Sequence, residues 1–401
     1  MKAHHSSHPF SCLSLCLSLS IFSFFSCSKG PASVEQMLES MTIREKVAQT
    51  VMVDIYGKGD KENEAVLKSL VKEGLGGIIC MEAPVEDNVK ELNLLQAKAR
   101  IPLLVSVDAE WGLAMRFPEY PAFPKQLKLG EIPDAEDLVY DMGKAIAGEL
   151  KGAGIHINFA PVVDVNSNPE VPSLGERAFG SDVALVTRYA EAYMKGMQEG
   201  GIFTCAKHFP GHGEAEVDSH IGLPVINFSR ERLDSLELVP YKRLISEGLD
   251  MVMIGHLAVP ALDPSGVPAS ISKPIVTGLL KEEMGFDGVV VTDALQMKGV
   301  TSGRDSVRVV LEAFNAGADI LLMPENAQAS IDLIVSEVES GNIPESFLDA
   351  KVEKILRMKE KAGLFGKGRP YITKHLKEAV SSAVKTDNAV LEAIEKKKSG
   401  I

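Results

Sequence analysis

From about residue 45 onward, short runs of apolar residues alternate with longer stretches in which apolar residues recur every three or four positions. Continuous runs rich in Val and Ile are typical of parallel strands that are buried on both faces. The spacing in the stretches between them, such as residues 137–154 and 182–201, predicts amphipathic helices. The predicted strands lie at residues 47–55, 75–81, 102–108, 157–165, 203–209, 251–256, 288–294 and 320–326.

Eight strand–helix units in succession predict an α/β protein with a single (β/α)₈ barrel, also called a TIM barrel. A doubly wound open sheet is the alternative. No G-x-G-x-x-G sequence follows the first predicted strand, which argues against a dinucleotide-binding fold. We expect the barrel to span residues 35–365, with a helix at 329–338, and a helical tail to span 366–401 without a second α/β domain. Glycines that close predicted helices support this division: Gly154, Gly201, Gly248 and Gly317.

The N-terminus has a different composition from the rest of the chain. Residues 1–34 contain no Asp or Glu, and Lys2 precedes an apolar, serine-rich stretch that ends at Cys27. This layout resembles a secretory signal, and the sequence FFSC at 24–27 resembles a bacterial lipoprotein processing site. We therefore expect residues 1–27 to direct export to the periplasm or the membrane surface, with membrane attachment through a lipidated Cys27. Plain cleavage that removes or frees Cys27 is the alternative.

Composition excludes some classes of partner. The formal net charge of −13 argues against nucleic acid, because phosphate binding needs a basic face. Cys80 and Cys205 fall in strongly apolar runs and are expected to be buried thiols, and no cysteine spacing typical of a metal site is present.

Polar residues end five of the predicted strands. In a (β/α)₈ barrel the catalytic groups lie at the carboxyl ends of the strands, so we expect these residues to form one site. They are Asp108 after the third strand, Asp164 and Asn166 after the fourth, Lys207 and His208 after the fifth, His256 after the sixth and Asp293 after the seventh.

The segment KHFPGHGEAEVDSHIGLP at 207–224 is the densest group of titratable residues in the chain. Asp218 and His220 stand two residues apart, so the carboxylate can accept the imidazole N–H while the other ring nitrogen exchanges a proton with a substrate. Asp293, directly after an apolar strand, suits a nucleophile, although a helix N-cap is the alternative. A nucleophilic carboxylate and a separate proton donor are typical of a retaining glycosidase.

A metal site is the second interpretation of this segment. His208, His212 and His220 could ligate a metal ion together. Pro210 and Gly211 separate the first two histidines, so they do not share a helix face, and no H-E-x-x-H sequence is present. We therefore expect neither a metal nor a cofactor, and we expect His212 to brace the loop.

The sequence KHFPGHGEAEVDSHIGLP closely resembles the signature of the family 3 glycoside hydrolases, in their β-N-acetylglucosaminidase (β-N-acetylhexosaminidase) branch. The resemblance spans about residues 35–365 and includes GIHINFAPVVDVNSNP, MVMIGHLAVPALD and GVVVTDALQMKGV. It implies that Asp293 is the nucleophile and that Asp218 and His220 form an acid/base dyad. It also implies sugar-binding positions at Asp108, Arg116, Arg177, Lys207 and His208.

The sequence departs from the family pattern around Asp108. VDAEWGLAMRF stands where D-x-E-G-G-R is usual, so that Trp111 and Leu113 replace Gly and Arg, and GERAFG replaces the usual xxRSFG. Trp111, the only tryptophan, either stacks on a sugar ring or caps the barrel. Relatives that act on glucosides commonly carry a second α/β domain and take the proton donor from outside the barrel. The resemblance here implies a donor on the barrel's own loop.

We therefore expect an exported, exo-acting glycoside hydrolase that retains the anomeric configuration. Its expected substrates are terminal β-linked GlcNAc residues of peptidoglycan fragments or chitooligosaccharides, and it is expected to be a monomer. A β-glucosidase-like or phosphorolytic family 3 enzyme is the first alternative. A metal-dependent barrel hydrolase and a non-catalytic sugar-binding lipoprotein are the others.

Overall fold

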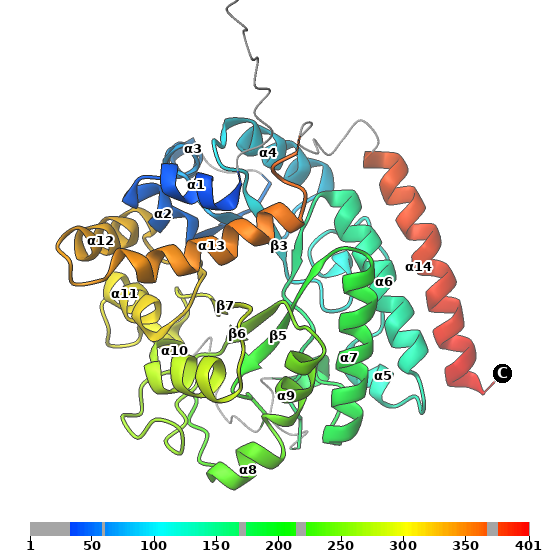
Figure 1. Cartoon of the computed structure of the whole chain (residues 1–401). Helices are drawn as coiled ribbons and strands as arrows, with labels where there is room; N and C mark the ends of the chain where they lie inside the picture. Colours follow the sequence, from blue (N-terminus) through cyan, green and yellow to red (C-terminus); the bar gives the residue numbers. More distant parts are fainter. Residues whose placement is uncertain (1–32, 58–60, 168–173, 214–221, 367–375, 401) are drawn as a thin grey trace, which may run out of the picture. The chain divides into compact units, whose positions relative to one another are not determined.

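Eight parallel strands form the centre of the protein in a computed structural model that describes residues 33–57, 61–167, 174–213, 222–366 and 376–400 (Figure 1). The expected signal segment, Cys27 included, lies outside these residues. The strands pair in the order β7-β6-β5-β4-β3-β2-β1-β8, and a bridge between Val291 and Ile320 joins the two edges. The predicted (β/α)₈ barrel is confirmed. The strands are β1 Val51–Ile55, β2 Gly77–Cys80, β3 Leu104–Val107, β4 Ile157–Asn158, β5 Phe203–Phe209, β6 Met251–Ile254, β7 Val289–Thr292 and β8 Leu321–Leu322.

Each predicted apolar run contains one strand, but three runs were predicted much too long, among them 320–326, which holds only the two residues of β8. The start of the first run, residues 47–49, belongs to helix α2. These residues are buried, and a short buried run looks the same in a sequence whether it is a strand or the end of a helix. The fourth run, 157–165, holds a strand of two residues only. Pro161 has no N–H to give to a ladder, and pairing resumes as a single bridge between Val162 and Lys207.

Helices follow the strands around the barrel (Figure 1). Gly154, Gly201, Gly248 and Gly317 all have positive φ at or just after helix ends, as predicted. None of the described helices is both long and apolar enough to cross a membrane. The helices are α1 Val34–Ser40, α2 Ile43–Gln49, α3 Lys61–Glu73, α4 Val85–Lys98, α5 Gln126–Gly130, α6 Glu136–Ala153, α7 Val183–Glu199, α8 Arg230–Ser235, α9 Val239–Ser246, the π-helix Pro274–Glu283, α10 Lys298–Thr301, α11 Ser306–Ala316, α12 Ala327–Glu339, α13 Glu345–Lys361 and α14 Leu376–Ser399.

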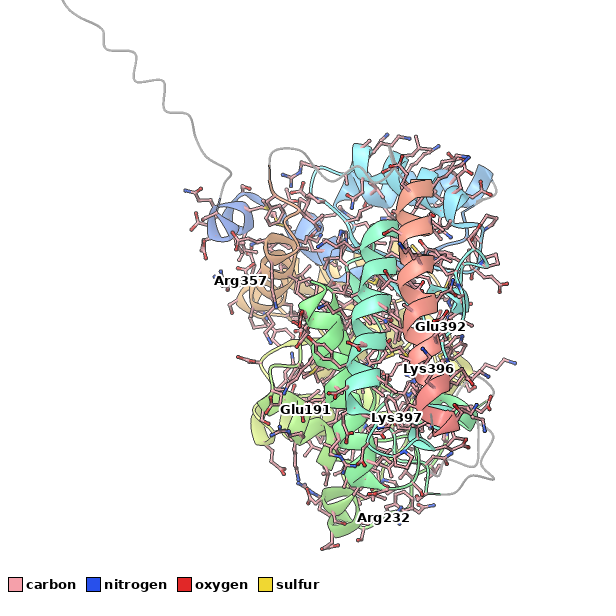
Figure 2. All side chains as sticks on the ribbon, turned by 90° about the vertical axis from the view of Figure 1, so that its right-hand side faces the viewer. Glu191, Arg232, Arg357, Glu392, Lys396 and Lys397 are labelled. Carbon is pink, nitrogen blue, oxygen red and sulfur yellow. The ribbon has the colours of Figure 1, made fainter. Side chains whose placement is uncertain are left out.

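The core has two parts. One fills the inside of the barrel with side chains such as Met52, Leu104 and Met251, and the other lies between the strands and the surrounding helices. Cys80 and Cys205 are buried and free, as predicted. The predicted helical tail is present as α14, which packs along α6 on the outside of the barrel (Figure 2). Its last turn carries three exposed lysines, so this end is solvated as expected.

Helices α6 and α7 approach each other closely through glycines. A Cβ at Gly196 of α7 would lie 2.0 Å from the carbonyl oxygen of Tyr140 in α6, and a Cβ at Gly143 would lie 2.5 Å from that of Tyr193. A backbone carbonyl cannot turn aside as a side chain can. The contact therefore requires glycine for steric reasons, and it fixes the distance between the two helices.

We predict that Gly196→Ala lowers the free energy of unfolding by about 3 kcal/mol, because the two helix backbones must move apart. The matched control is Gly148→Ala in α6, where a Cβ would meet no atom within 4 Å. This exposed substitution should raise the free energy of unfolding by about 0.5 kcal/mol through the lower entropy of the unfolded chain. Urea unfolding followed by circular dichroism measures both. Equal midpoints for the two variants would contradict the close packing.

Candidate active site

A cavity of about 460 Å³ lies at the carboxyl ends of the strands. Six of the predicted site residues that the structure describes line it: Asp108, Arg116, Arg177, Lys207, His208 and Asp293. Asp218 and His220 lie outside the described residues, and their dyad stays a prediction.

The alternation of side chains along the strands explains why these groups meet. Successive side chains of a strand point to opposite faces, so every second residue of a barrel strand points inward. Cys205 and Val291 belong to the apolar layer inside the barrel. Lys207 and Asp293 follow them by two positions, and they continue the same inward series at the level where the cavity begins.

Lys207 and His208 are neighbours in β5, yet both line the cavity. A regular strand would turn one of them outward. The pairing of β5 with β6 shifts register between Ala206 and Phe209. Such an irregularity re-aims side chains, so that two consecutive residues reach the same space.

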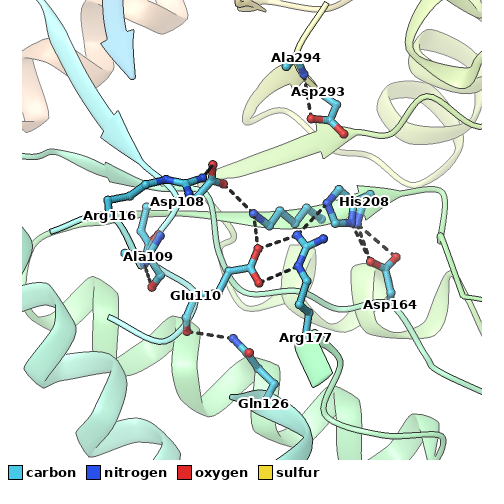
Figure 3. A network of polar contacts seen from close by, with 12 residues as sticks. Asp108, Ala109, Glu110, Arg116, Gln126, Asp164, Arg177, His208, Asp293 and Ala294 are labelled. Carbon is cyan, nitrogen blue, oxygen red and sulfur yellow. Dashed lines mark hydrogen bonds and ion pairs between the residues drawn. The ribbon is translucent and has the colours of Figure 1, made fainter. Parts of the chain in front are cut away.

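Figure 3 shows Asp108, Glu110, Arg116 and Arg177, which belong to a network of alternating charges around Lys207. Its Nζ donates to Asp108 Oδ1 at 2.8 Å and forms an ion pair with Glu110 Oε1 at 2.7 Å. Glu110 also accepts two bonds from the guanidinium of Arg177, at 2.7 and 3.0 Å. The guanidinium of Arg116 donates to Asp108 Oδ2 at 2.9 Å.

This network fixes the charge of its members. Burial by itself would lower the pKa of Lys207, but Asp108 and Glu110 outweigh it and raise that pKa. Burial would likewise raise the pKa of Glu110, whereas Lys207 and Arg177 hold it well below its ordinary value. The ammonium and the carboxylates therefore stay ionised at neutral pH, ready to exchange hydrogen bonds with the hydroxyl groups of a ligand.

Glu110 is the functional residue that the sequence interpretation missed. Its side chain is fully buried and accepts from Lys207 and Arg177, two of the three Lys and Arg side chains that line the cavity. The signal was present in the sequence, because Glu110 follows Asp108 by two positions and residues two apart share a face of an extended chain. The charge pattern alone could not show that the residues after β3 bring both carboxylates into the cavity.

Asp164 supports the cavity from behind and does not line it, contrary to expectation. Its carboxylate accepts from the ring Nδ1 of His208 at 2.8 Å and from the backbone N–H of His212 at 2.7 Å. These bonds orient His208 so that its Nε2 lies 3.4 Å from Arg177. Burial lowers the pKa of His212 to about 4, so this ring is neutral near pH 7.

Asn166 and His256 also stand outside the cavity lining, although both were expected in the shared site. The backbone N–H of Asn166 donates to Gly180. His256 Nδ1 lies 2.7 Å from the hydroxyl of Ser270, and its Nε2 lies 3.0 Å from the carbonyl of Ala294. His256 therefore holds the residue that follows Asp293 and braces the site.

Asp293 directly follows β7 and lines the cavity. Its Oδ1 accepts from the backbone N–H of Ala294 at 2.8 Å, and no helix begins there, since α10 starts at Lys298. The N-cap alternative for Asp293 is therefore wrong. Burial would raise the pKa of this carboxyl, but His256, His208 and the Ala294 N–H hold it below its ordinary value. The carboxylate is thus ionised and available as a nucleophile.

The other side of the cavity is apolar. Around the barrel, β7, β8 and β2 contribute residues such as Met297, Met323 and Met81, opposite the polar residues of β3 to β5. Met323 has a φ of 49°, a backbone conformation that is uncommon for a residue with a side chain and that clusters at functional sites. The flexible thioethers form a wall that adapts to an apolar group of a ligand.

Trp111 is not among the residues that line the cavity. Its ring is half-buried against the core, and Nζ of Lys125 lies 5.3 Å from the ring centroid. Of the two expected roles, the contacts favour capping the barrel.

The metal interpretation finds no support in the described part of the chain. Within it, no group of three or more His, Cys, Asp or Glu side chains is arranged to hold a metal ion. His220, the third histidine of that interpretation, lies outside it.

Comparison with known proteins places this arrangement in a family. The beta-hexosaminidase A of Pseudoalteromonas piscicida is 33% identical over 319 residues, which cover 72% of this chain but 53% of that protein. The beta-hexosaminidase LpqI of Mycobacterium tuberculosis is 34% identical over 353 residues, 83% of this chain and 86% of the relative. The structure of a family 3 beta-N-acetylglucosaminidase from Paenibacillus sp. str. FPU-7 is similar with a TM-score of 0.77 and 34% identity, over 87% of this chain and 69% of that one.

The family model named glycosyl hydrolase family 3 N terminal domain matches residues 42–358, which include every described strand and every residue that lines the cavity. The chain belongs to glycosyl hydrolase family 3.

Proposed function

We propose that the protein is a retaining, exo-acting β-N-acetylglucosaminidase that releases terminal GlcNAc from peptidoglycan fragments or chitooligosaccharides. The observation that carries this proposal is an ionised carboxylate, Asp293, at the edge of a cavity whose far side holds paired cations and carboxylates. The similarity to proteins named beta-hexosaminidase and beta-N-acetylglucosaminidase supports the sugar.

In the proposed reaction, Asp293 attacks the anomeric carbon and forms a covalent glycosyl–enzyme while the glycosidic C–O bond breaks. His220, steadied by Asp218, gives its proton to the leaving oxygen. His220 then takes a proton from water, whose oxygen attacks the anomeric carbon and displaces Asp293. Two displacements retain the anomeric configuration. The roles of Asp218 and His220 rest on the sequence motif.

The polar side of the cavity suits the hydroxyl groups of one terminal sugar. Asp108 can accept from a hydroxyl, while Lys207 and Arg177 can donate to its oxygens. The apolar layer of the barrel, with Ile79, Met253 and Leu322, closes the floor. A closed floor favours the end of a glycan over its middle and therefore exo action.

The apolar side of the cavity supports GlcNAc over glucose. Asp293 must lie next to the anomeric carbon, and the acetamido group is attached to the neighbouring carbon. Met297 and Met323 line the same cavity as Asp293 and can pack against the acetyl methyl, which glucose lacks.

The N-terminal sequence supports export of this enzyme. Residues 1–27 resemble a lipoprotein signal, so we propose attachment to a membrane through Cys27.

Replacing the nucleophile tests the proposal directly. Asp293→Asn should lower kcat for an aryl β-GlcNAc by roughly a thousandfold or more, because an amide cannot form the glycosyl ester. The control is Asp287→Asn, the same change at the exposed opposite end of β7. It should leave kcat within about twofold. Full activity of Asp293→Asn would contradict the assignment.

Glu110 tests the charge network without touching the nucleophile. Glu110→Gln removes the charge that holds Lys207 and Arg177, so both cations shift and kcat/KM should fall by about 10- to 100-fold. Glu176→Gln, an exposed position next to Arg177, is the matched control and should change little. A Glu110→Gln enzyme with normal kinetics would show that the buried carboxylate does not position the cations.

A panel of aryl β-glycosides separates the alternatives. The apolar wall should favour the N-acetylglucosaminide over the glucoside by about 10- to 200-fold in kcat/KM, since one methyl group in a pocket gives that discrimination. Proton NMR of the first product should show the β-anomer. Equal rates on both sugars would favour the β-glucosidase-like alternative, and a sugar phosphate formed in phosphate buffer would favour the phosphorolytic one.

A further inference from the structure

Helix α14 carries an acidic residue within its buried face. Its apolar residues recur every three or four positions and pack against the core, which is the pattern of a helix with one buried stripe. Asp387 falls at a position of this stripe and is fully buried. The stripe consists of Leu376, Val380, Ala383, Asp387, Val390, Leu391 and Ile394. The helix lies beyond residues 42–358, which the family model matches.

Asp387 meets a second buried acid, Glu149 of α6. Their carboxyl groups interact in the buried contact between α14 and α6. No N–H or O–H of the described residues reaches Glu149 Oε1 or either carboxyl oxygen of Asp387. Ionised carboxylates only accept hydrogen bonds and repel each other, so two buried carboxyl groups in this contact require a proton on one of them. Oε1 of Glu149, which has no partner among the described residues, is the natural place for it.

The other oxygen of Glu149 holds the loop that follows β3. Oε2 accepts from the backbone N–H of Leu113 at 2.6 Å. The carbonyl of Leu113 in turn accepts from the N–H groups of Arg116 and Phe117, at 2.9 and 2.7 Å. Met115 and Arg116 of this loop line the cavity, and Arg116 reaches Asp108. A continuous set of bonds thus leads from Glu149, beside α14, to the charge network of the site.

Few other titratable groups face the pair. Tyr120 and Tyr193 interact with Glu149 from the loop after β3 and from α7, and Glu119 acts on Tyr120. Burial raises the pKa of both tyrosines well above the ordinary value, so neither titrates between pH 5 and 8. Burial also raises the pKa of Asp387 to about 6, and burial and Asp387 raise that of Glu149 well above its ordinary value.

We propose that Glu149 and Asp387 are positioning residues that share one proton, clasp α14 to α6, and hold the loop of residues 112–117 in the arrangement that the cavity needs. The structure assigns this clasp independently of the reaction proposed above.

The clasp makes the loop sensitive to pH. Both groups bind a proton more tightly in the folded protein than in the unfolded chain. Their stabilising contribution is therefore fully present below about pH 4 and is lost as the pH rises through about 6 and beyond. Once the shared proton leaves, two buried carboxylates repel each other. We expect α14 to loosen from α6 and Leu113 to lose its fixed acceptor.

Trp111 provides a reporter, because it is the only tryptophan and lies two residues before Leu113. The fluorescence of the full chain should change as the pH rises through about 6 and above it, and amide exchange of α14 should accelerate over the same range. In Glu149→Gln the amide oxygen can still accept from Leu113 and the amide N–H can donate to Asp387 without a proton. The fluorescence change should fall below about a fifth of its normal amplitude there and in Asp387→Asn.

Glu392→Gln is the matched control, since Glu392 is exposed on the same helix (Figure 2). It should titrate like the unchanged protein. The proposal is overturned if the Trp111 titration is the same in Glu149→Gln and the unchanged protein, or if exchange in α14 does not depend on pH. Both readouts are independent of turnover, so a failure of the clasp and a failure of the proposed reaction are distinguishable. If the protein cleaves aryl β-GlcNAc, Asp387→Asn should also retain more of its kcat/KM above pH 7 than the unchanged enzyme.

Discussion

The ammonium group of Lys207, buried at the end of β5, is the group around which the site is built. A buried cation is tolerated only with close counter-charges, and the removal of one partner from such a pair costs about 3–5 kcal/mol. Asp108 and Glu110 meet this need, and their excess charge is taken up by Arg116 and Arg177. The loops after β3 and β4 must therefore close over β5. The resulting rim presents donors and acceptors in fixed positions, which a flexible surface could not do without a large loss of entropy on binding.

The barrel makes this arrangement possible. Side chains alternate between the two faces of each strand, so polar residues from distant parts of the chain point inward together at the carboxyl ends of the strands. The same geometry keeps Asp293 apart from the carboxylates of the network. It has its own partners, the Ala294 N–H and the nearby histidines, which favour its ionised form. The carboxylates of the cavity thus differ in their partners. Asp108 and Glu110 neutralise the cations, whereas Asp293 would act on the substrate in the proposed reaction.

The support of the site extends beyond the barrel. Asp164 and His256 orient His208 and the segment after β7 from behind. On the outer surface, the contact between α14 and α6 reaches the loop after β3 through Glu149. A buried pair of acids stabilises a contact between helices less than an apolar pair, because the acids must be desolvated and must hold a proton. The pair lies beneath a loop that lines the cavity, so we infer that it positions this loop as well as packing the helix.

The sequence by itself determined the class of fold and most of the site. Eight apolar runs, separated by stretches with helical spacing, predict the barrel. A parallel strand is buried on both faces, so it appears in the sequence as a continuous apolar run. The strand ends at Asp108, Lys207 and Asp293 follow from the same pattern. The sequence could not determine that 47–49 is helical, that Lys207 and His208 both face inward, or that Asp164 and His256 stand behind the site. Those outcomes depend on a register shift and on contacts between residues far apart in the chain. Only the tertiary structure could pair Glu110 with Arg177 or Asp387 with Glu149, because a charge in a sequence carries no information about which charge will be buried beside it.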